Sequence, residues 1–144
     1  MLIPAVPAGS TVVAVGIDVV AVDRFAAALE RTPGLGRRLF DPDEMVSVTG
    51  HPRGPASLAA RFAVKEAVAK ALGVPSGMDW HDCRVVSELG GRPVLHVSQT
   101  VAVAAAALGI AEWRISISHD AGIAAAVVLA LGPAGSGSAG GTPG

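Results

Sequence analysis

The sequence predicts an α+β domain with a mainly antiparallel sheet packed on a long central helix. The expected elements run strand, three helices, hairpin, helix, hairpin, so that helices cluster early and strands late. This order is typical of α+β folds. The late strands are joined by glycine-containing turns, which favour antiparallel hairpins. A long alanine-rich segment at 59–73 lies between the two groups and is expected to form the central helix.

The first expected strand is Thr11–Ile17, a short β-branched run that indicates a buried strand. Asp18 ends this run. Its carboxylate could cap the following helix, which is expected at Val20–Arg31, or it could bind a ligand. The sequence Thr32-Pro33-Gly34 then stops the helix.

Two short helical segments precede the central helix. Gly36–Phe40 is expected to form one helical turn, and Asp41-Pro42-Asp43-Glu44 opens another. In that motif Asp41 is the cap, Pro42 takes the first helical position and Glu44 completes a capping box.

The central helix is uninterrupted by glycine or proline before Gly73, where a left-handed C-terminal cap is expected; Ser57 is a candidate for its N-terminal cap. At about 100° per residue, both sides of this helix are apolar, which is typical of a buried helix. Glu66 is therefore a carboxylate among alanines. It either pairs with Lys70 one turn further on or, being costly to bury alone, has another partner or a cation.

The second half of the chain is expected to contain two hairpins separated by a helix. Gly90-Gly91 forms the turn of the first hairpin, Ser98 caps the helix, and 119–122 form the turn of the second hairpin. The expected bounds are strands Arg84–Leu89 and Arg92–Val97, helix Ser98–Leu108, and strands Trp113–Ser118 and Ile123–Leu131. The domain is thus expected at 11–131, after an extended lead-in at 1–10 and before a flexible Gly/Ala/Ser/Pro tail at 132–144.

The composition is that of a small and unusually apolar domain. The chain has 144 residues, of which 51% are hydrophobic and 16% charged, with a mean hydropathy of +0.52. So much apolar surface predicts a homo-oligomer with apolar interfaces. The net charge of −1 gives no signal for nucleic-acid binding, and no apolar run is long enough to span a membrane. The single cysteine, Cys83, fits a reducing cytoplasm.

Asp18 and Glu66 are the residues best suited to chemistry. If they face each other, their oxygens suit Mg²⁺, which prefers one or two carboxylates together with waters and substrate phosphates. Lys65 and Lys70 flank Glu66 in sequence, and such cations indicate a polyanionic ligand. The four histidines show no zinc spacing with the cysteine, and glycine-rich phosphate loops are absent from the sequence.

Three segments resemble a known family, the holo-acyl-carrier-protein synthases, which are small phosphopantetheinyl transferases. The opening segment 15–25 (V-G-I-D-V-V-A-V-D-R-F) resembles the first motif of that family. The segment 61–73 (R-F-A-V-K-E-A-V-A-K-A-L-G) resembles the more specific second motif, R-F-x-x-K-E-A-x-x-K-A. The segment 115–120 (I-S-I-S-H-D) resembles the S-x-S-H motif before the last strand, and Gly91-Arg92-Pro93 is similar to the G-K/R-P hairpin. Ala14 departs from the glycine common in the family.

This resemblance implies a phosphopantetheinyl-transferase-like fold and a homotrimer with active sites between subunits. It implies transfer of 4′-phosphopantetheine from coenzyme A to a serine of apo acyl carrier protein, with Mg²⁺ as cofactor and adenosine 3′,5′-bisphosphate as by-product. Such an enzyme would serve fatty acid biosynthesis and lipid metabolism in the cytoplasm. Asp18 and Glu66 would bind the metal and, with Lys70, form the catalytic set; the serine's proton would go to Glu66, Asp18 or a metal-bound water. The implied coenzyme A contacts are Phe62, Lys70, Gly73, Ser118 and His119.

Arg24 and Arg31 share one face of the first helix, with Arg37 and Arg38 just beyond. They form either a solvated basic face or, as the resemblance implies, a docking surface for the acidic carrier protein. His119 likewise has a simpler interpretation as a turn residue. Two rival functions fit the same residues: a non-catalytic module that binds carrier protein or coenzyme A, and a Mg²⁺-dependent hydrolase of nucleotide pyrophosphates.

Overall fold

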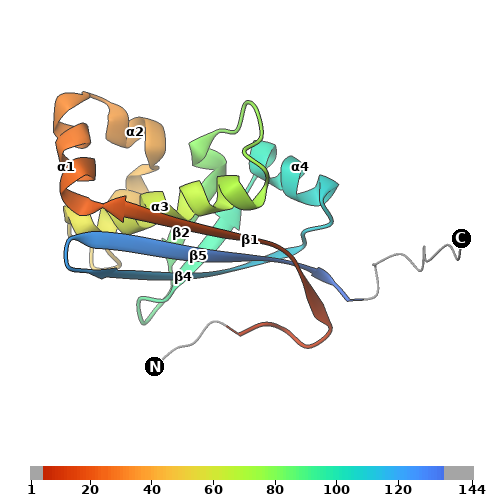
Figure 1. The fold of residues 1–144 in the computed structure, drawn as a ribbon. Helices are drawn as coiled ribbons and strands as arrows, with labels where there is room; N and C mark the ends of the chain where they lie inside the picture. Colours follow the sequence, from red (N-terminus) through yellow and green to blue (C-terminus); the bar gives the residue numbers. More distant parts are fainter. Residues whose placement is uncertain (1–4, 135–144) are drawn as a thin grey trace, which may run out of the picture.

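The computed structural model describes residues 5–134 and combines two antiparallel sheets with four helices and two 3₁₀ turns (Figure 1). The expected order of strand, three helices, hairpin, helix and hairpin is confirmed. The elements are β1 (Ser10–Ala21), α1 (Val22–Arg31), α2 (Leu35–Leu39), η1 (Pro42–Met45), α3 (Pro55–Ala71), η2 (Trp80–Asp82), β2 (Cys83–Ser87), β3 (Pro93–Val97), α4 (Gln99–Ala107), β4 (Glu112–Asp120) and β5 (Ile123–Pro133).

The larger sheet has the strand order β1-β5-β4, with both pairs antiparallel. Helix α3 runs along one face of this sheet, and the β2–β3 hairpin forms a second, two-stranded sheet (Figure 1). The main core lies between α3, the sheet and α4. Its fully buried members include Val64 and Val68 of α3 and Val128 of β5. The low helix propensity of valine is offset here by burial on both sides of α3.

A second apolar cluster lies under α1 and α2, where Phe25 and Phe40 meet edge to face with ring centroids 6.3 Å apart. It joins these short helices to the N-terminal half of α3, where Leu58 and Ala59 are buried. The amphipathic helix α1 thus buries Phe25 and leaves its basic residues in solvent.

Strand β1 and helix α3 touch backbone to backbone at Gly16. A Cβ atom added at Gly16 would lie 1.8 Å from the carbonyl oxygen of Ala67. Only glycine allows this approach. Because side chains alternate along a strand, Asp18 emerges on the same face as Gly16, the face that meets α3.

Four sequence expectations need correction. Strand β1 continues through Asp18 to Ala21, so Asp18 neither ends the strand nor caps α1, whose N-cap is Ala21. Ser57 lies inside α3, which begins at Pro55 after Gly54; proline is favoured at the first helical position. In the β2–β3 hairpin, Glu88 N–H donates to Arg92 O at 2.9 Å, which leaves a three-residue loop that includes Leu89.

The fourth correction concerns the last hairpin. Strand β4 runs through His119 to Asp120, and only Ala121 and Gly122, with φ of 50° and 78°, form the turn. His119 is therefore a strand residue. Strand β5 also extends past Leu131 to Pro133, so residues 132 and 133, which were expected in the tail, belong to the strand. Residues 1–4 of the expected lead-in and 135–144 of the expected tail lie outside the described residues.

Several local predictions are confirmed. Gly73 has the left-handed φ of 77° expected after α3, and Asp41 and Glu44 form the capping box at η1. Ser98 is at the N-cap position of α4, although its side chain does not cap the helix and its hydroxyl donates to Asp82 Oδ1 at 3.4 Å. Within residues 5–134, no helix is both long and apolar enough to cross a bilayer.

Candidate active site

Three of the predicted site residues, Asp18, Glu66 and Lys70, lie in the same region, where β1 crosses α3. Lys70 Nζ donates to Asp18 Oδ1 at 2.8 Å and to the carbonyl oxygen of Ile17 at 3.1 Å. The side chain of Asp18 is 15% exposed and that of Lys70 is 51% exposed. The resulting ion pair joins residues 52 positions apart and is open to a ligand on the lysine side.

The Glu66–Lys70 pair, one of the two alternatives that helical spacing left open, does not form, because Lys70 pairs with Asp18 instead. Within residues 5–134, the Glu66 carboxylate makes no hydrogen bond or ion pair, although it lies close enough to Lys70 and Asp18 to feel both charges. Burial raises the pKa of Glu66, the charge of Asp18 raises it further, and the charge of Lys70 lowers it. Two carboxylates that repel each other across a half-buried site would accept a cation.

The donor set fits Mg²⁺ better than a metal that needs a complete protein cage. Among residues 5–134, no group of three or more His, Cys, Asp and Glu side chains converges on one point. Mg²⁺ is commonly held by one or two carboxylates, with water and substrate phosphates completing its shell. Asp18 and Glu66 are the two carboxylates that could hold such an ion here.

Lys65, the other lysine beside Glu66, lies in a different environment. Its side chain is fully buried, and its Nζ donates to Glu44 Oε1 at 3.0 Å, to Trp80 O at 3.0 Å and to Cys83 O. The ammonium also lies 5.5 Å from the centroid of the Phe40 ring. Lys65 therefore cannot contact a polyanionic ligand beside Glu66. Of the two lysines that flank Glu66 in sequence, only Lys70 is exposed enough for such a contact.

Helical spacing separates Lys65 from Glu66, since their side chains point about 100° apart, but it does not predict that Lys65 is buried. Arg61 and Lys65 are four residues apart, so they share one face of α3, and that face points away from Glu66. Both are buried, with Arg61 only 4% exposed. The sequence motif predicts for Glu44 only its part in a capping box. Its second oxygen accepts from Val85 N–H at 3.0 Å, so this carboxylate joins η1, β2 and α3.

The residues implied in coenzyme A binding occupy three separate places in one copy of the chain. The ring of Phe62 stacks on Phe25 at 5.0 Å and lies 6.1 Å from Trp80, on the side of α3 that faces α1. Gly73 follows α3, and a Cβ atom there would meet nothing within 4 Å. Ser118 and His119 lie at the end of β4.

Ser118 and His119 point to opposite faces of the sheet because they are consecutive strand residues. His119 pairs with Ala124, and it lines a hollow of about 270 Å³ together with Asp23 and Ala56. Ser118 faces away from α3, whereas Asp18 faces toward it. One copy of the chain therefore does not bring Ser118 to the Asp18–Glu66 pair.

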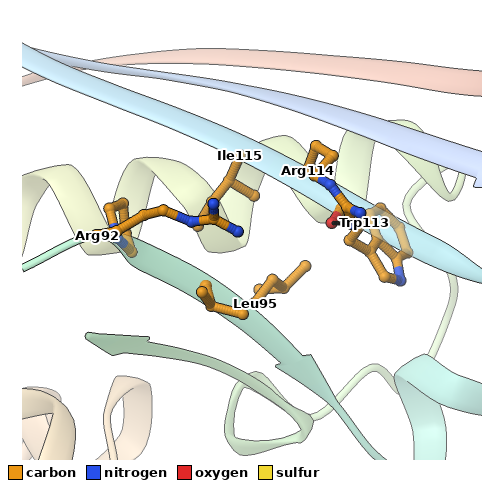
Figure 2. A pocket seen from close by; sticks show the side chains of 7 residues that line it. Arg92, Leu95, Trp113, Arg114 and Ile115 are labelled. Carbon is orange, nitrogen blue, oxygen red and sulfur yellow. Dashed lines mark hydrogen bonds between the residues drawn. The ribbon is translucent and has the colours of Figure 1, made fainter. Parts of the chain in front are cut away.

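A second hollow, of about 40 Å³, lies between β3 and β4 and is lined by none of the predicted site residues. Figure 2 shows Leu95, Trp113, Ile115 and two arginines, Arg92 and Arg114, around it. Arg114 is already engaged: its Nε donates to Ala5 O at 2.7 Å and its Nη2 to Glu112 Oε2 at 3.3 Å. This space is too small for a nucleotide.

The two arginines predicted as a docking surface, Arg24 and Arg31, are exposed on α1. Arg37 and Arg38 are exposed on α2 nearby. The basic face is thus open to a partner, as either interpretation of these residues requires.

Comparison with known proteins identifies relatives along nearly the whole described chain. The profile of the 4′-phosphopantetheinyl transferase superfamily matches residues 14–128. A holo-[acyl-carrier-protein] synthase of Salinispora arenicola is 60% identical over 119 residues, which cover 83% of this chain and 98% of that protein. The corresponding Streptomyces coelicolor protein is 60% identical over 122 residues, 85% of this chain and 99% of the relative.

A solved structure extends this likeness to three dimensions. The crystal structure of Helicobacter pylori holo-[acyl-carrier-protein] synthase in complex with coenzyme A matches with a TM-score of 0.68 and 30% identity, covering 81% of this chain and 98% of that one. The sequence motifs, the fold and these relatives agree. The chain belongs to the 4′-phosphopantetheinyl transferase superfamily, and within it to the holo-[acyl-carrier-protein] synthase family.

Proposed function

We propose that the protein transfers 4′-phosphopantetheine from coenzyme A to a serine hydroxyl of apo acyl carrier protein, requires Mg²⁺ and releases adenosine 3′,5′-bisphosphate. The observation that carries this proposal is the meeting of Asp18 with Glu66 and Lys70 at the crossing of β1 and α3. The relatives, which are named for this activity, and the coenzyme A complex of one of them support the choice of substrates.

The three side chains have different electrostatic roles. Asp18 and Glu66 would hold a divalent cation, which polarises the diphosphate and stabilises the charge on the departing phosphate ester. Lys70 supplies a positive charge to the same region. The Lys70 side chain is half exposed while its ammonium is bound to Asp18. The ammonium can therefore also bind a phosphate oxygen of a ligand at the same place. Positioning and neutralisation are the main requirements of phosphoryl transfer, and these residues supply both.

Phe62, Gly73, Ser118 and His119 complete the proposed coenzyme A contacts, with the last two contributed by a neighbouring copy. Such sharing accounts for the opposite directions of Ser118 and Asp18 within one copy. The β1 side chains that face away from α3 support an assembly, since Val15, Ile17 and Val19 are 56%, 57% and 60% exposed. An apolar row of this kind on a strand is typical of a subunit interface.

A homotrimer therefore forms part of the proposal. Ile17→Lys places a charge in the exposed row without touching the α3 side, and it should convert the assembly to a monomer in light scattering. Transfer should be lost with the trimer. An unchanged mass would remove the β1 face from the proposed interface.

Arg24 and Arg31 would dock the acidic carrier protein on α1. Opposite potentials mainly speed the encounter of partners, so Arg24→Glu should raise the Michaelis constant for the carrier at least about tenfold. The constant for coenzyme A is the internal control and should stay within about twofold. Equal effects on the two constants would count against docking at this face.

The deciding experiment is intact-mass spectrometry of a cognate apo carrier after incubation with the protein, coenzyme A and Mg²⁺. We expect the carrier to gain one phosphopantetheine. Glu66→Gln should abolish the gain, and Glu88→Gln, which changes an exposed glutamate of the β2–β3 loop, should leave it intact. A protein that binds coenzyme A without modifying any carrier would be the non-catalytic module. Release of free phosphopantetheine would identify a hydrolase.

A cytoplasmic location completes the proposal. Coenzyme A and apo carrier proteins are its required substrates, and the single cysteine, Cys83, is a buried free thiol, as in proteins of reducing compartments. Cell fractionation would test it, and recovery of the protein from a compartment without coenzyme A would contradict it.

A further inference from the structure

Two arginines share their hydrogen-bond partners beside the N-terminal half of α3. Ser57 Oγ accepts from Arg53 Nη1 at 3.2 Å and from Arg61 Nη1 at 2.9 Å. Ser87 Oγ accepts from Arg53 Nη2 and Arg61 Nη2, both at 3.1 Å. Two like charges are thus held together by two neutral hydroxyl groups.

This arginine pair has no carboxylate of its own. Within residues 5–134, neither guanidinium forms an ion pair, and Arg61 Nε is buried without a hydrogen-bond partner. Glu44 lies close enough to act on both arginines, but its carboxylate already pairs with Lys65. Burial and then the charge of Arg53 lower the pKa of Arg61 to about 10, whereas Glu44 opposes the change.

The pair therefore carries uncompensated positive charge in a partly buried place, which is costly without a counter-ion. The hydroxyl groups of Ser57 and Ser87 also have capacity for a further acceptor. Each accepts two N–H groups, and among the described residues neither donates its own hydrogen. A hydroxyl can donate one bond in addition to those that it accepts.

A hollow of about 220 Å³ opens beside the pair. Arg53 and Ser87 line it, together with Ser47, Asp43 and the valines 46, 48, 85 and 86. The acidic member, Asp43, is engaged by Arg84 Nη1 at 2.9 Å. Two hydrogen bonds fix Arg53. Its backbone N–H donates to Met45 O at 2.9 Å, and its side-chain Nε donates to Glu44 O at 3.1 Å. The donors are therefore held in place before any ligand arrives.

We propose that this hollow binds a phosphate-type oxyanion, with Arg53 and the Ser87 hydroxyl as the contacting groups. Guanidinium groups and hydroxyls are suited to tetrahedral oxyanions, and charge-assisted hydrogen bonds make such contacts strong. Arg61 acts as a positioning residue, since it donates hydrogen bonds to the hydroxyls of Ser57 and Ser87 and adds positive charge. The site is separate from Asp18, Glu66 and Lys70, because Arg61 and Glu66 point about 140° apart around α3.

The test is a titration of the full-length protein with inorganic phosphate, followed by amide ¹H–¹⁵N NMR shifts at constant ionic strength. We expect saturable shifts at Arg53, Ser57 and Ser87. Absence of saturable shifts there, or shifts confined to the surroundings of Asp18 and Lys70, would overturn the proposal.

Matched variants sharpen the result. Arg53→Gln should weaken phosphate binding at least about tenfold, the value of a lost charge-assisted bond. Arg38→Gln removes an exposed arginine of α2 and should change it less than about twofold. Ser87→Ala keeps both charges and should also weaken binding, so it serves if Arg53→Gln fails to fold. Equal affinities in Arg53→Gln, Ser87→Ala and Arg38→Gln would contradict the assignment.

A last arm identifies the source of the oxyanion. If saturating coenzyme A displaces phosphate from these residues, the ligand is a phosphate group of coenzyme A, bound by the same or a neighbouring copy. If the phosphate shifts persist in its presence, the site takes free phosphate. Both outcomes leave the oxyanion site in place, and neither depends on transfer activity.

Discussion

Helix α3 directs two lysines to carboxylates far away in the sequence, and the two ion pairs differ in almost every physical respect. Lys65 and Glu44 are 3.0 Å apart, and both side chains are fully buried. Lys70 and Asp18 are 2.8 Å apart, but half of the Lys70 side chain is exposed. The two pairs have similar lengths, so their different roles follow from their surroundings.

The buried pair has every charge satisfied by protein. Lys65 binds one carboxylate and two carbonyl groups, so no donor is left for a ligand. The exposed pair leaves Lys70 accessible and has Glu66 beside it without a hydrogen-bond partner in the described chain. The first pair therefore holds η1, β2 and α3 together, and the second is available for binding. Four substitutions or conditions test this contrast.

Lys65→Met should give the largest effect, a loss of about 3–5 kcal/mol in the free energy of unfolding, because Glu44 would remain buried without a counter-charge. Urea denaturation measures this loss. The double variant Lys65→Met/Glu44→Leu removes both charges and should recover most of the stability. If Lys65→Met lowered the free energy of unfolding by less than about 1 kcal/mol, the Lys65–Glu44 pair would contribute no more than a weak surface ion pair, which would contradict this prediction.

Gly16→Ala should follow, because the new methyl group would overlap the carbonyl oxygen of Ala67. Overpacking of this kind costs about 1–3 kcal/mol. Transfer should fall as well, since β1 must shift and take Asp18 with it. Gly54→Ala is the control: its φ is −74°, and a Cβ atom there meets nothing within 4 Å. Equal losses in the two variants would contradict the proposed role of the strand–helix contact.

Lys70→Met should impair activity more than stability, whereas Lys65→Met should mainly lower stability. Stability should change by less than about 1 kcal/mol, as for other exposed pairs. The kcat/KM for coenzyme A should fall roughly 10- to 100-fold, through loss of a charge-assisted contact with phosphate. Steady-state kinetics combined with denaturation measure both quantities. A large loss of stability with unchanged kinetics would make Lys70 a structural residue like Lys65.

The pH dependence of stability should show the smallest effect. Burial, followed by the charge of Asp18, raises the pKa of Glu66 from its ordinary value of 4.5. The folded protein therefore binds this proton more tightly than the unfolded chain does. The associated stabilisation is complete below pH 4.5 and is lost as the pH rises through the higher folded pKa.

Glu66→Gln lacks this titration. The free energy of unfolding of Glu66→Gln, relative to that of the unchanged protein, should therefore increase as the pH rises from 4.5 through the folded pKa of Glu66. Urea denaturation at several pH values measures the difference. A difference independent of pH would contradict the raised pKa of Glu66.

The sequence predicted the order of the elements because each depends on local signals such as alternation, helical spacing and glycine turns. It also singled out Asp18 and Glu66, since one is next to a buried strand and the other is on a buried helix. That the two carboxylates act together was implied only by the family resemblance. The length of β1 was underestimated because aspartate is uncommon inside strands. In this fold the Asp18 side chain points to α3, and its backbone pairs with Ala126 of β5, a partner more than 100 residues away.

The role of Lys65 could not be predicted from local patterns. Its burial depends on Glu44, 21 residues earlier, and on the carbonyl groups of Trp80 and Cys83, which follow it by 15 and 18 residues. The same holds for Arg61, whose partner Ser87 is 26 residues away. Contacts between distant segments decide which cations of α3 are available to a ligand, and a single sequence carries little information about them.

The missing side chain at Gly16 has a consequence for how such a protein could be altered. Since main-chain atoms of β1 and α3 are already in contact there, the spacing between Asp18 and Glu66 cannot be tuned by exchanging a spacer side chain. Redesign for a bulkier substrate would have to act away from this backbone contact. The spacing of the two carboxylates and the breadth of substrates should therefore vary independently.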